Sequence, residues 1–201
     1  MRRLLLGAGA VAAGLLAATT AHAQDRIKDT IKIGVILPYS GQFADPTAQI
    51  DNGIRLYLKQ HGDKLAGKNV ELIRKDVGGI NPPVAKRLAQ ELVTRDGVDI
   101  LAGFSLTPNA LAAADVSAEA KTFMVVMNAA TAIVTTKSPY MVRVSFTVPQ
   151  LNQTLGTWAG KRGLKNAYTM VTDYGPGIDA EAAFQKGFKE AGGDIVGSVR
   201  M

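Results

Sequence analysis

The stretch IKIGVILPYSG, residues 31–41, combines the pattern of a buried strand with a loop that can meet a ligand. Its apolar residues run almost without interruption, which favours burial on both faces, as in a parallel sheet. Pro38 cannot donate to a strand ladder and Gly41 tolerates positive φ, so the strand ends here and the chain turns where a helix is about to begin. Ligands of open α/β sheets bind at strand ends of this kind.

Strand and helix patterns alternate along the rest of the chain. Short apolar runs typical of buried strands are separated by segments whose apolar residues recur at helical spacing. The expected strands lie at residues 31–37, 70–73, 98–102, 122–127, 141–144, 167–172 and 194–199, and the expected apolar helix faces at 50–58, 85–93, 111–118, 151–159 and 184–191. This alternation predicts an α/β fold, with a parallel sheet flanked by helices and joined by right-handed crossovers.

Helical spacing also assigns a position to three aromatic side chains and two acids. Trp158 lies at helical spacing in one predicted helix, and Phe184 and Phe188 do so in the next, which favours packing in a core over stacking on a ligand. Asp51 falls opposite the apolar face of its helix, and Asp45 lies near the start of that helix. A solvated or capping role is therefore expected for both carboxylates.

The first 23 residues have the pattern of a secretory signal peptide. Arg2 and Arg3 precede an apolar run at residues 4–16, and small residues follow up to Ala23, after which we expect cleavage. The run is too short for a transmembrane helix, and no Cys follows it to carry a lipid anchor. We therefore expect a periplasmic protein whose first mature residue is Gln24.

The remaining chain divides at a polar connection, residues 145–149. We expect a first α/β ligand-binding lobe at residues 24–145 and the start of a second α/β lobe at residues 146–201. The last predicted strand has nothing after it to cover or extend it. We therefore expect the chain to be incomplete, with its second lobe only begun.

Composition argues against nucleic acid as a partner. Removing residues 1–23 leaves 21 basic and 17 acidic residues, a net charge of +4. These charges alternate in sign, with no basic run or interleaved aromatic residues to follow a phosphate backbone. The chain has no Cys, which excludes disulfides and thiolate metal sites.

Neither an enzyme nor a cofactor site is expected. The predicted mature chain has a single histidine, His61, in a polar loop, so it offers neither a nucleophile and base pair nor a histidine zinc site. The glycine pattern at residues 7–12 lies within the signal peptide, and the stretch at 62–69 ends in Asn69 and precedes a strand instead of a helix. Neither pattern meets the requirements of a nucleotide-binding loop.

Three polar loops follow predicted strands and are expected to meet at one edge of the sheet. They are residues 39–41, 103–109 and 128–131. Thr107 stands at a helix N-terminus, where free N–H groups and the helix dipole favour an anion such as a carboxylate. An N-cap role for Thr107 is the alternative. Thr131 can both donate and accept, so the convergence of the loops predicts a ligand site.

At these residues the sequence resembles the branched-chain amino-acid (leucine/isoleucine/valine) binding proteins of ABC importers, which have the type I periplasmic binding fold. The resemblance runs from Ile31 to the chain end. It rests on Ile33-Gly34, Ser40-Gly41 and Gly53, the loop at 103–109, the turn Asn128-Ala129-Ala130-Thr131, and Asp173-Tyr174-Gly175.

The resemblance implies a role for several of these residues. Thr107 takes the place of the family's Ser or Thr that binds the ligand carboxylate, the carbonyl of Ala129 faces the ligand amino group, and Thr131 contributes its hydroxyl and N–H. Tyr174 closes over the ligand from the second lobe. The full set of expected ligand-binding residues is Tyr39, Ser40, Phe104, Ser105, Thr107, Asn128, Ala129, Ala130, Thr131 and Tyr174.

The implied function is that of a periplasmic solute-binding component that delivers a small amino acid or related organic acid to the permease of an ABC importer. Pro46 stands where leucine-type binders place an aromatic residue, and the family's acidic partner for the ligand ammonium is expected beyond Met201. An aromatic acid, which would use the same carboxylate site, is therefore an alternative ligand. A ligand-sensing domain of a receptor or regulator is the alternative function.

Overall fold

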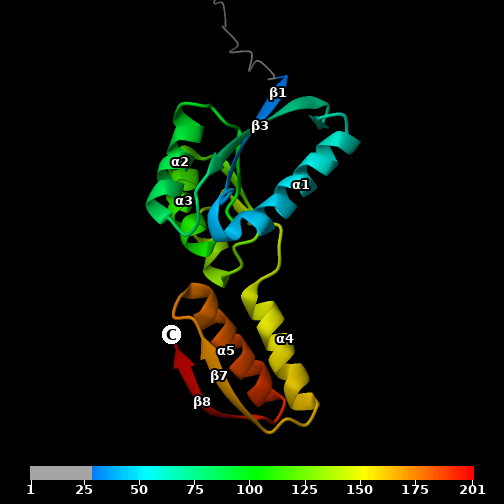
Figure 1. Cartoon of the computed structure of the whole chain (residues 1–201), viewed down its shortest axis with the longest axis vertical. Coiled ribbons are helices and arrows are strands. Elements are labelled where there is room, and N and C mark those ends of the chain that lie inside the picture. Colours follow the sequence, from blue (N-terminus) through cyan, green and yellow to red (C-terminus); the bar gives the residue numbers. More distant parts are fainter. Residues whose placement is uncertain (1–28) are drawn as a thin grey trace, which may run out of the picture.

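A computed structural model describes residues 29–201 as two α/β units (Figure 1). The first unit, residues 30–143, holds a six-stranded sheet, and the second unit, residues 148–200, holds a two-stranded sheet and two helices. The elements in chain order are β1 (Thr30–Leu37), the 3-10 helix η1 (Gly41–Phe43), α1 (Ala44–Gln60), β2 (Lys64–Leu65), β3 (Lys68–Asp76), α2 (Pro82–Thr94), β4 (Ile100–Gly103), α3 (Thr107–Ala120), β5 (Phe123–Val126), the 3-10 helix η2 (Ala132–Thr136), β6 (Met141–Arg143), α4 (Val148–Lys161), β7 (Asn166–Val171), α5 (Gly175–Glu190) and β8 (Asp194–Arg200).

The predicted signal peptide and its cleavage site lie outside the described residues, so they remain predictions. Within residues 29–201, no helix has the length and apolar character needed to cross a membrane.

The large sheet has the strand order β2-β3-β1-β4-β5-β6. β1 lies at its centre and pairs in parallel with β3 on one side and β4 on the other, and β5 and β6 continue the parallel pattern. The expected α/β fold with a parallel sheet flanked by helices is therefore confirmed. β2 is the exception, because it pairs antiparallel with β3 in a hairpin that the sequence patterns did not predict.

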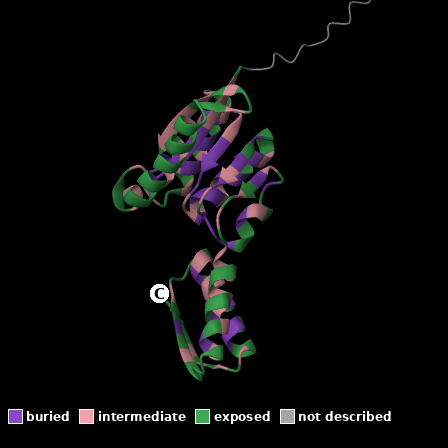
Figure 2. Cartoon of the chain, turned by 90° about the vertical axis from the view of Figure 1, so that its right-hand side faces the viewer, coloured by how far each residue is buried: buried purple, intermediate pink, exposed green. Residues whose placement is uncertain are grey.

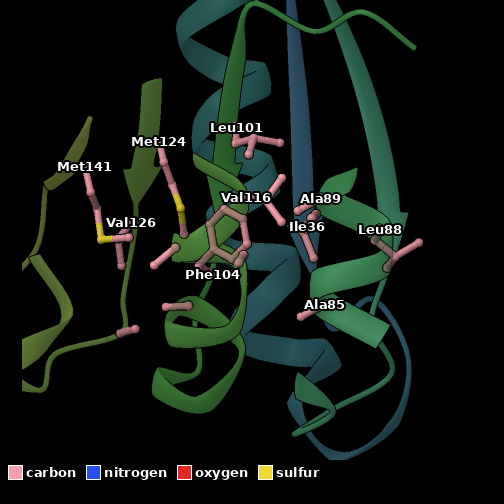
Figure 3. Packing of buried hydrophobic residues seen from close by; sticks show 14 of the residues in the cluster. Ile36, Ala85, Leu88, Ala89, Leu101, Phe104, Val116, Met124, Val126 and Met141 are labelled. Atoms are coloured by element: carbon pink, nitrogen blue, oxygen red, sulfur yellow. The ribbon is translucent and has the colours of Figure 1, made fainter. Parts of the chain in front are cut away.

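The main core lies between the sheet and helices α2 and α3, which cover the same face (Figures 1 and 3). Leu101, Met124 and Val116 lie around Phe104, and Leu88 lies on the other side of the cluster, near Ala85 and Ala89. The predicted apolar face of α2 is buried here, at Ala85, Leu88, Ala89 and Leu92. On the other face, Val35, Leu37 and Ala102 pack with Ile50 of α1. The carboxyl ends of β1, β4 and β5 are held in place between these helix layers.

Asp51 of α1 is buried, which corrects the expectation that it faces solvent. Only 5% of the residue is exposed. Its Oδ1 accepts from Arg74 Nε at 2.6 Å and its Oδ2 from Arg55 Nε at 2.6 Å. Burial raises the pKa of Asp51, but the hydrogen bonds and charges of Arg74 and Arg55 outweigh burial and hold that pKa below its ordinary value. Helical spacing could not reveal this role because Arg74 comes from β3.

An Asp51→Asn variant is expected to lower the free energy of unfolding by about 2 kcal/mol at neutral pH, because it removes the anion between two guanidinium groups. The folded pKa of Asp51 lies below its unfolded value, so its stabilisation is present above about pH 4 and is lost as the pH falls through the folded pKa. Urea unfolding at a series of pH values should therefore show that the unfolding free energies of the native chain and the variant become equal at acidic pH. Glu119→Gln, which changes an exposed carboxylate, is the control. A stability difference that does not vary with pH would contradict this account.

The second unit has a thinner core, as the burial colours of Figure 2 show. Phe188 of α5 is fully buried against α4. A Cβ at Gly156 of α4 would lie 2.2 Å from the carbonyl oxygen of Phe184, so glycine at this position permits the close approach of α4 to α5. Trp158 is 53% exposed, with the Arg162 guanidinium 5.6 Å from its ring centroid. The expectation that Trp158 packs in a core is therefore wrong, because α5 and the two-stranded sheet do not cover that side of α4.

Candidate ligand-binding site

Loops from both units surround one cavity of about 210 Å³ at the carboxyl ends of β4 and β5. The first unit contributes the start of α3, the loop after β5, and Ile80 from the loop after β3. The second unit contributes the start of α5, and the connection between the units contributes Phe146. The lining residues are Ile80, Ser105, Leu106, Thr107, Pro108, Asn128, Ala129, Ala130, Phe146, Tyr174 and Pro176.

Two buried threonines form a hydroxyl pair at this cavity. Thr107 is 5% exposed and lines the cavity, and Thr131 is 3% exposed. Their Oγ1 atoms lie 2.8 Å apart, within hydrogen-bond distance. Each hydroxyl has one proton, so the bond between them uses one proton and leaves the other for a third group. The residue before α3 is Leu106, and no side chain caps the helix, so the alternative N-cap role of Thr107 is wrong.

Two helix N-termini face this pair. α3 begins at Thr107, and α5 begins at Gly175, where a Cβ would lie 3.4 Å from Thr131 Cγ2 and 3.9 Å from Thr107 Cγ2. Neither helix has a side-chain cap at its start. N–H groups of a first turn have no acceptor within their own helix, and the helix dipole is positive there. Both helices therefore favour a negative charge near the hydroxyl pair.

The loop that carries Thr131 is held by both ends of the connection between the units. Arg143 Nη1, at the end of β6, donates to the carbonyl oxygen of Thr131 at 2.8 Å and to that of Ala129 at 3.4 Å. The backbone N–H of Val148, the first residue of α4, donates to the carbonyl oxygen of Ala130 at 2.9 Å. These bonds fix the direction in which the loop presents its groups.

The first predicted loop does not line the cavity. Tyr39 donates its hydroxyl proton to Asp51 at 3.3 Å, and burial, followed by the charge of Asp51, raises the pKa of Tyr39 to about 12. The N–H groups of Tyr39, Ser40 and Gly78 all donate to Asp76 Oδ1, at 2.9, 3.3 and 2.8 Å. Desolvation raises the pKa of Asp76, but these bonds and one from the Ser40 hydroxyl outweigh it, so that pKa is lowered.

Phe104 is also placed away from the cavity lining, since its side chain lies in the main core. Of the expected ligand-binding residues, six line the cavity together: Ser105, Thr107, Asn128, Ala129, Ala130 and Tyr174. Thr131 joins them through Thr107, whereas Tyr39, Ser40 and Phe104 belong to other clusters. The structure therefore brings together the second and third predicted loops and the predicted residue of the second lobe.

Sequence patterns missed Ile80, Phe146 and Pro176. Ile80 reaches the cavity because Asn109 ties its loop to α3, donating to the Gly79 carbonyl oxygen at 2.8 Å and accepting from Asn81 N at 2.9 Å. Phe146 was detectable as an aromatic residue in an otherwise polar connection. Ser105 adds a hydroxyl oxygen that is buried and has no hydrogen-bond partner among the described residues.

Within the described part of the chain, none of the cavity-lining residues carries a charge. Residues 29–201 also contain no group of three or more His, Asp or Glu side chains arranged to hold a metal ion. A wider groove of about 640 Å³ runs along α4, but it lies on the outer face of that helix, at residues such as Thr154, Trp158 and Lys161. The smaller cavity therefore has the features of a site for a small, uncharged or singly anionic organic molecule.

Comparison with known proteins shows the protein family to which the chain belongs. Residues 30–201 match the family described as periplasmic binding protein. The chain belongs to the periplasmic binding protein family. Members of this family are periplasmic substrate-binding proteins of ABC transporters, and they are not enzymes.

Individual relatives differ in the ligand that their names mention. A Leu/Ile/Val-binding protein homolog of Brucella abortus is 44% identical over all 201 residues, which cover 50% of its length. The chain is also similar to a solute binding protein of an ABC transporter from Rhodopseudomonas palustris BisB5, whose structure was determined in complex with 3,4-dihydroxybenzoic acid. The two are 48% identical, with a TM-score of 0.82, and the match covers 86% of this chain and 47% of that chain. Another from R. palustris, in complex with 4-hydroxybenzoate, is 46% identical with the same TM-score of 0.82 and the same coverage of 86% and 47%. The chain thus spans about half the length of the relatives it matches.

Proposed function

We propose that this periplasmic binding protein binds an aromatic monocarboxylic acid of the hydroxybenzoate type in the cavity and delivers it to the permease of an ABC importer. The Thr107–Thr131 pair, placed in an uncharged cavity between two helix N-termini, carries the proposal. In this reading, residues 24–145 form the first lobe and residues 146–201 belong to the second.

The hydroxyl pair is the proposed carboxylate site. One hydroxyl proton of Thr107 or Thr131 remains available after their mutual bond. A hydrogen bond to a charged group is worth roughly 1.5–3 kcal/mol, and the N-termini of α3 and α5 add a favourable potential for an anion. A ligand carboxylate would also supply acceptors for the first-turn N–H groups of both helices.

Exposed apolar side chains provide the proposed ring site. Ile80, Phe146 and Tyr174 line the cavity and are 52%, 48% and 42% exposed. An aromatic ring placed between them would remove apolar surface from water and form aromatic contacts with Phe146 and Tyr174. A cavity of about 210 Å³ suits a small ring better than a drug-sized ligand, for which pockets start at roughly 300 Å³. The two relatives from Rhodopseudomonas support this reading, since their ligands are hydroxybenzoates.

A branched-chain amino acid is the second candidate, and the name of the Brucella relative favours it. Its ammonium group would need an anionic or carbonyl partner in a desolvated site. The carbonyl oxygen of Ala129, which the resemblance gives to the ligand amino group, already lies 3.4 Å from Arg143 Nη1. This contact, together with the hydroxybenzoate ligands of the two Rhodopseudomonas relatives, favours the aromatic acid.

Titration calorimetry with four compounds separates the candidates. The chain without its first 23 residues is titrated with 4-hydroxybenzoate, benzoate, 4-hydroxybenzamide and leucine. We expect saturable binding of both aromatic acids. The neutral amide is expected to bind at least tenfold more weakly because it lacks the carboxylate charge. Leucine binding tighter than 4-hydroxybenzoate would overturn the aromatic proposal, and recovery of chemically altered ligand at catalytic rates would overturn the binding-protein role.

A further inference from the structure

A side chain of the second unit bonds to the backbone next to Thr131. Asp179 Oδ2, in α5, accepts a hydrogen bond from the N–H of Ala132 at 2.7 Å. Ala132 is the first residue of η2 in the first unit. The bond therefore joins the two units directly beside the hydroxyl pair.

Thr131 does not cap η2 with its own side chain. Thr131 occupies the N-cap position of η2, where a threonine hydroxyl ordinarily accepts from an N–H of its own helix. Here the side chain of Thr131 makes no such bond, and its Oγ1 lies 2.8 Å from Thr107 Oγ1. Asp179 accepts from the first N–H of η2, which an N-cap side chain does not reach, and the negative carboxylate suits the positive end of the helix.

We propose that Asp179 is a positioning residue that caps η2 from the opposite unit. The cap fixes the backbone next to Thr131, whose hydroxyl pairs with Thr107, and it fastens α5 over the cavity. This inference rests on the proposed function, because it concerns the same hydroxyl pair. Gly175 and Tyr174, at the start of α5, are held near the pair and the cavity by the same contact.

Loss of the Asp179 carboxylate has two expected consequences. The first N–H of η2 loses its acceptor, so the backbone beside Thr131, which places the Thr131 hydroxyl, is held less firmly. The second unit also loses a contact to the first, so the open arrangement of the units becomes more populated. Both effects release ligand faster, and neither removes a group from the cavity lining.

Amide hydrogen exchange tests the cap without any ligand. In ¹⁵N-labelled chain, the Ala132 amide should exchange about tenfold faster in Asp179→Ala than in the native chain, because its acceptor is gone. Asp179→Asn keeps a side-chain oxygen acceptor and should retain most of the protection. Asp194→Ala, which removes an exposed carboxylate in the same unit, is the control and should leave Ala132 unchanged. Equal exchange of Ala132 in native chain and Asp179→Ala would overturn the cap.

Stopped-flow binding of 4-hydroxybenzoate tests the coupling to the site. We expect Asp179→Ala to raise the dissociation rate roughly fivefold with little change in the association rate, and Asp179→Asn to lie close to native. Loss of Ala132 protection without any change in dissociation would overturn the positioning role. If the native chain binds none of the aromatic acids, the proposed function fails, whereas the exchange of Ala132 still decides whether Asp179 caps η2.

Discussion

A Thr107→Ala variant is expected to bind 4-hydroxybenzoate at least tenfold more weakly than the native chain. The substitution removes a buried hydroxyl from the cavity wall and leaves Thr131 Oγ1 without the partner that lies 2.8 Å away. A hydrogen bond to a carboxylate contributes roughly 1.5–3 kcal/mol, which corresponds to a roughly ten- to 150-fold change in affinity. Isothermal titration calorimetry measures the loss directly.

Matched variants separate the hydroxyl from the rest of the side chain. Thr107→Ser keeps the hydroxyl and is expected to bind within about threefold of native, whereas Thr131→Ala should resemble Thr107→Ala. The double variant should lose less than the sum of the two single losses, because the residues act as one pair. Thr94→Ala, at an exposed position in α2, controls for the substitution itself. Native affinity in both Thr107→Ala and Thr131→Ala would place the carboxylate site elsewhere.

A Gly103→Ala variant is expected to lose about 3 kcal/mol or more of unfolding free energy, the largest stability effect among these predictions. Gly103 ends β4 with φ +104, and a Cβ there would lie 2.3 Å from the carbonyl oxygen of Ile36 on β1. The clash is between main-chain neighbours in the centre of the sheet, so a side-chain rotation cannot relieve it. Urea unfolding followed by far-ultraviolet circular dichroism measures the loss.

Gly97→Ala is the matched control for backbone strain. Gly97 also has a positive φ, +65, but a Cβ there would meet nothing within 4 Å. Its replacement should cost only about 1 kcal/mol, the penalty of the left-handed conformation alone. Equal losses for Gly97→Ala and Gly103→Ala would show that the approach of β4 to β1 is not as close as the structure has it.

The sequence predicted those strands and helices of the first unit whose buried faces can be recognised from their own residues. The nearly continuous apolar run of β1 and the helical spacing of Ala85, Leu88 and Leu92 report burial directly, because each residue type follows the environment of its own face. The side chain of Asn81 accepts from Val84 N at 3.3 Å and caps α2, a role that Asn commonly has before a helix. Asp51 was misplaced because its partner Arg74 comes from another element, β3. Trp158 was misplaced because no other described element covers its side of α4.

The candidate site shows the same division. The loops at Thr107 and Thr131 were visible because small polar residues directly follow predicted strands. Ile80 was not visible, since an apolar residue in a loop has no local pattern to show that it faces a cavity. Tyr39 was placed in the site because its loop also follows a strand, but the hydrogen bonds of Asp51 and Asp76 hold that loop elsewhere.

The central position of β1 has a consequence for the order of folding. β1 is the first strand of the described chain, yet its two neighbours are β3 and β4, so Ile36 must wait for both Lys75 and Gly103 before its backbone is paired on each side. A chain that emerges with its N-terminus first therefore presents an apolar segment with two open edges until β3 is available, and with one open edge until β4 is available. Such non-local pairing slows folding and prolongs the exposure of apolar surface. The topology that places β1 at the centre of the sheet thus also postpones the pairing of its second edge until β4 has been made.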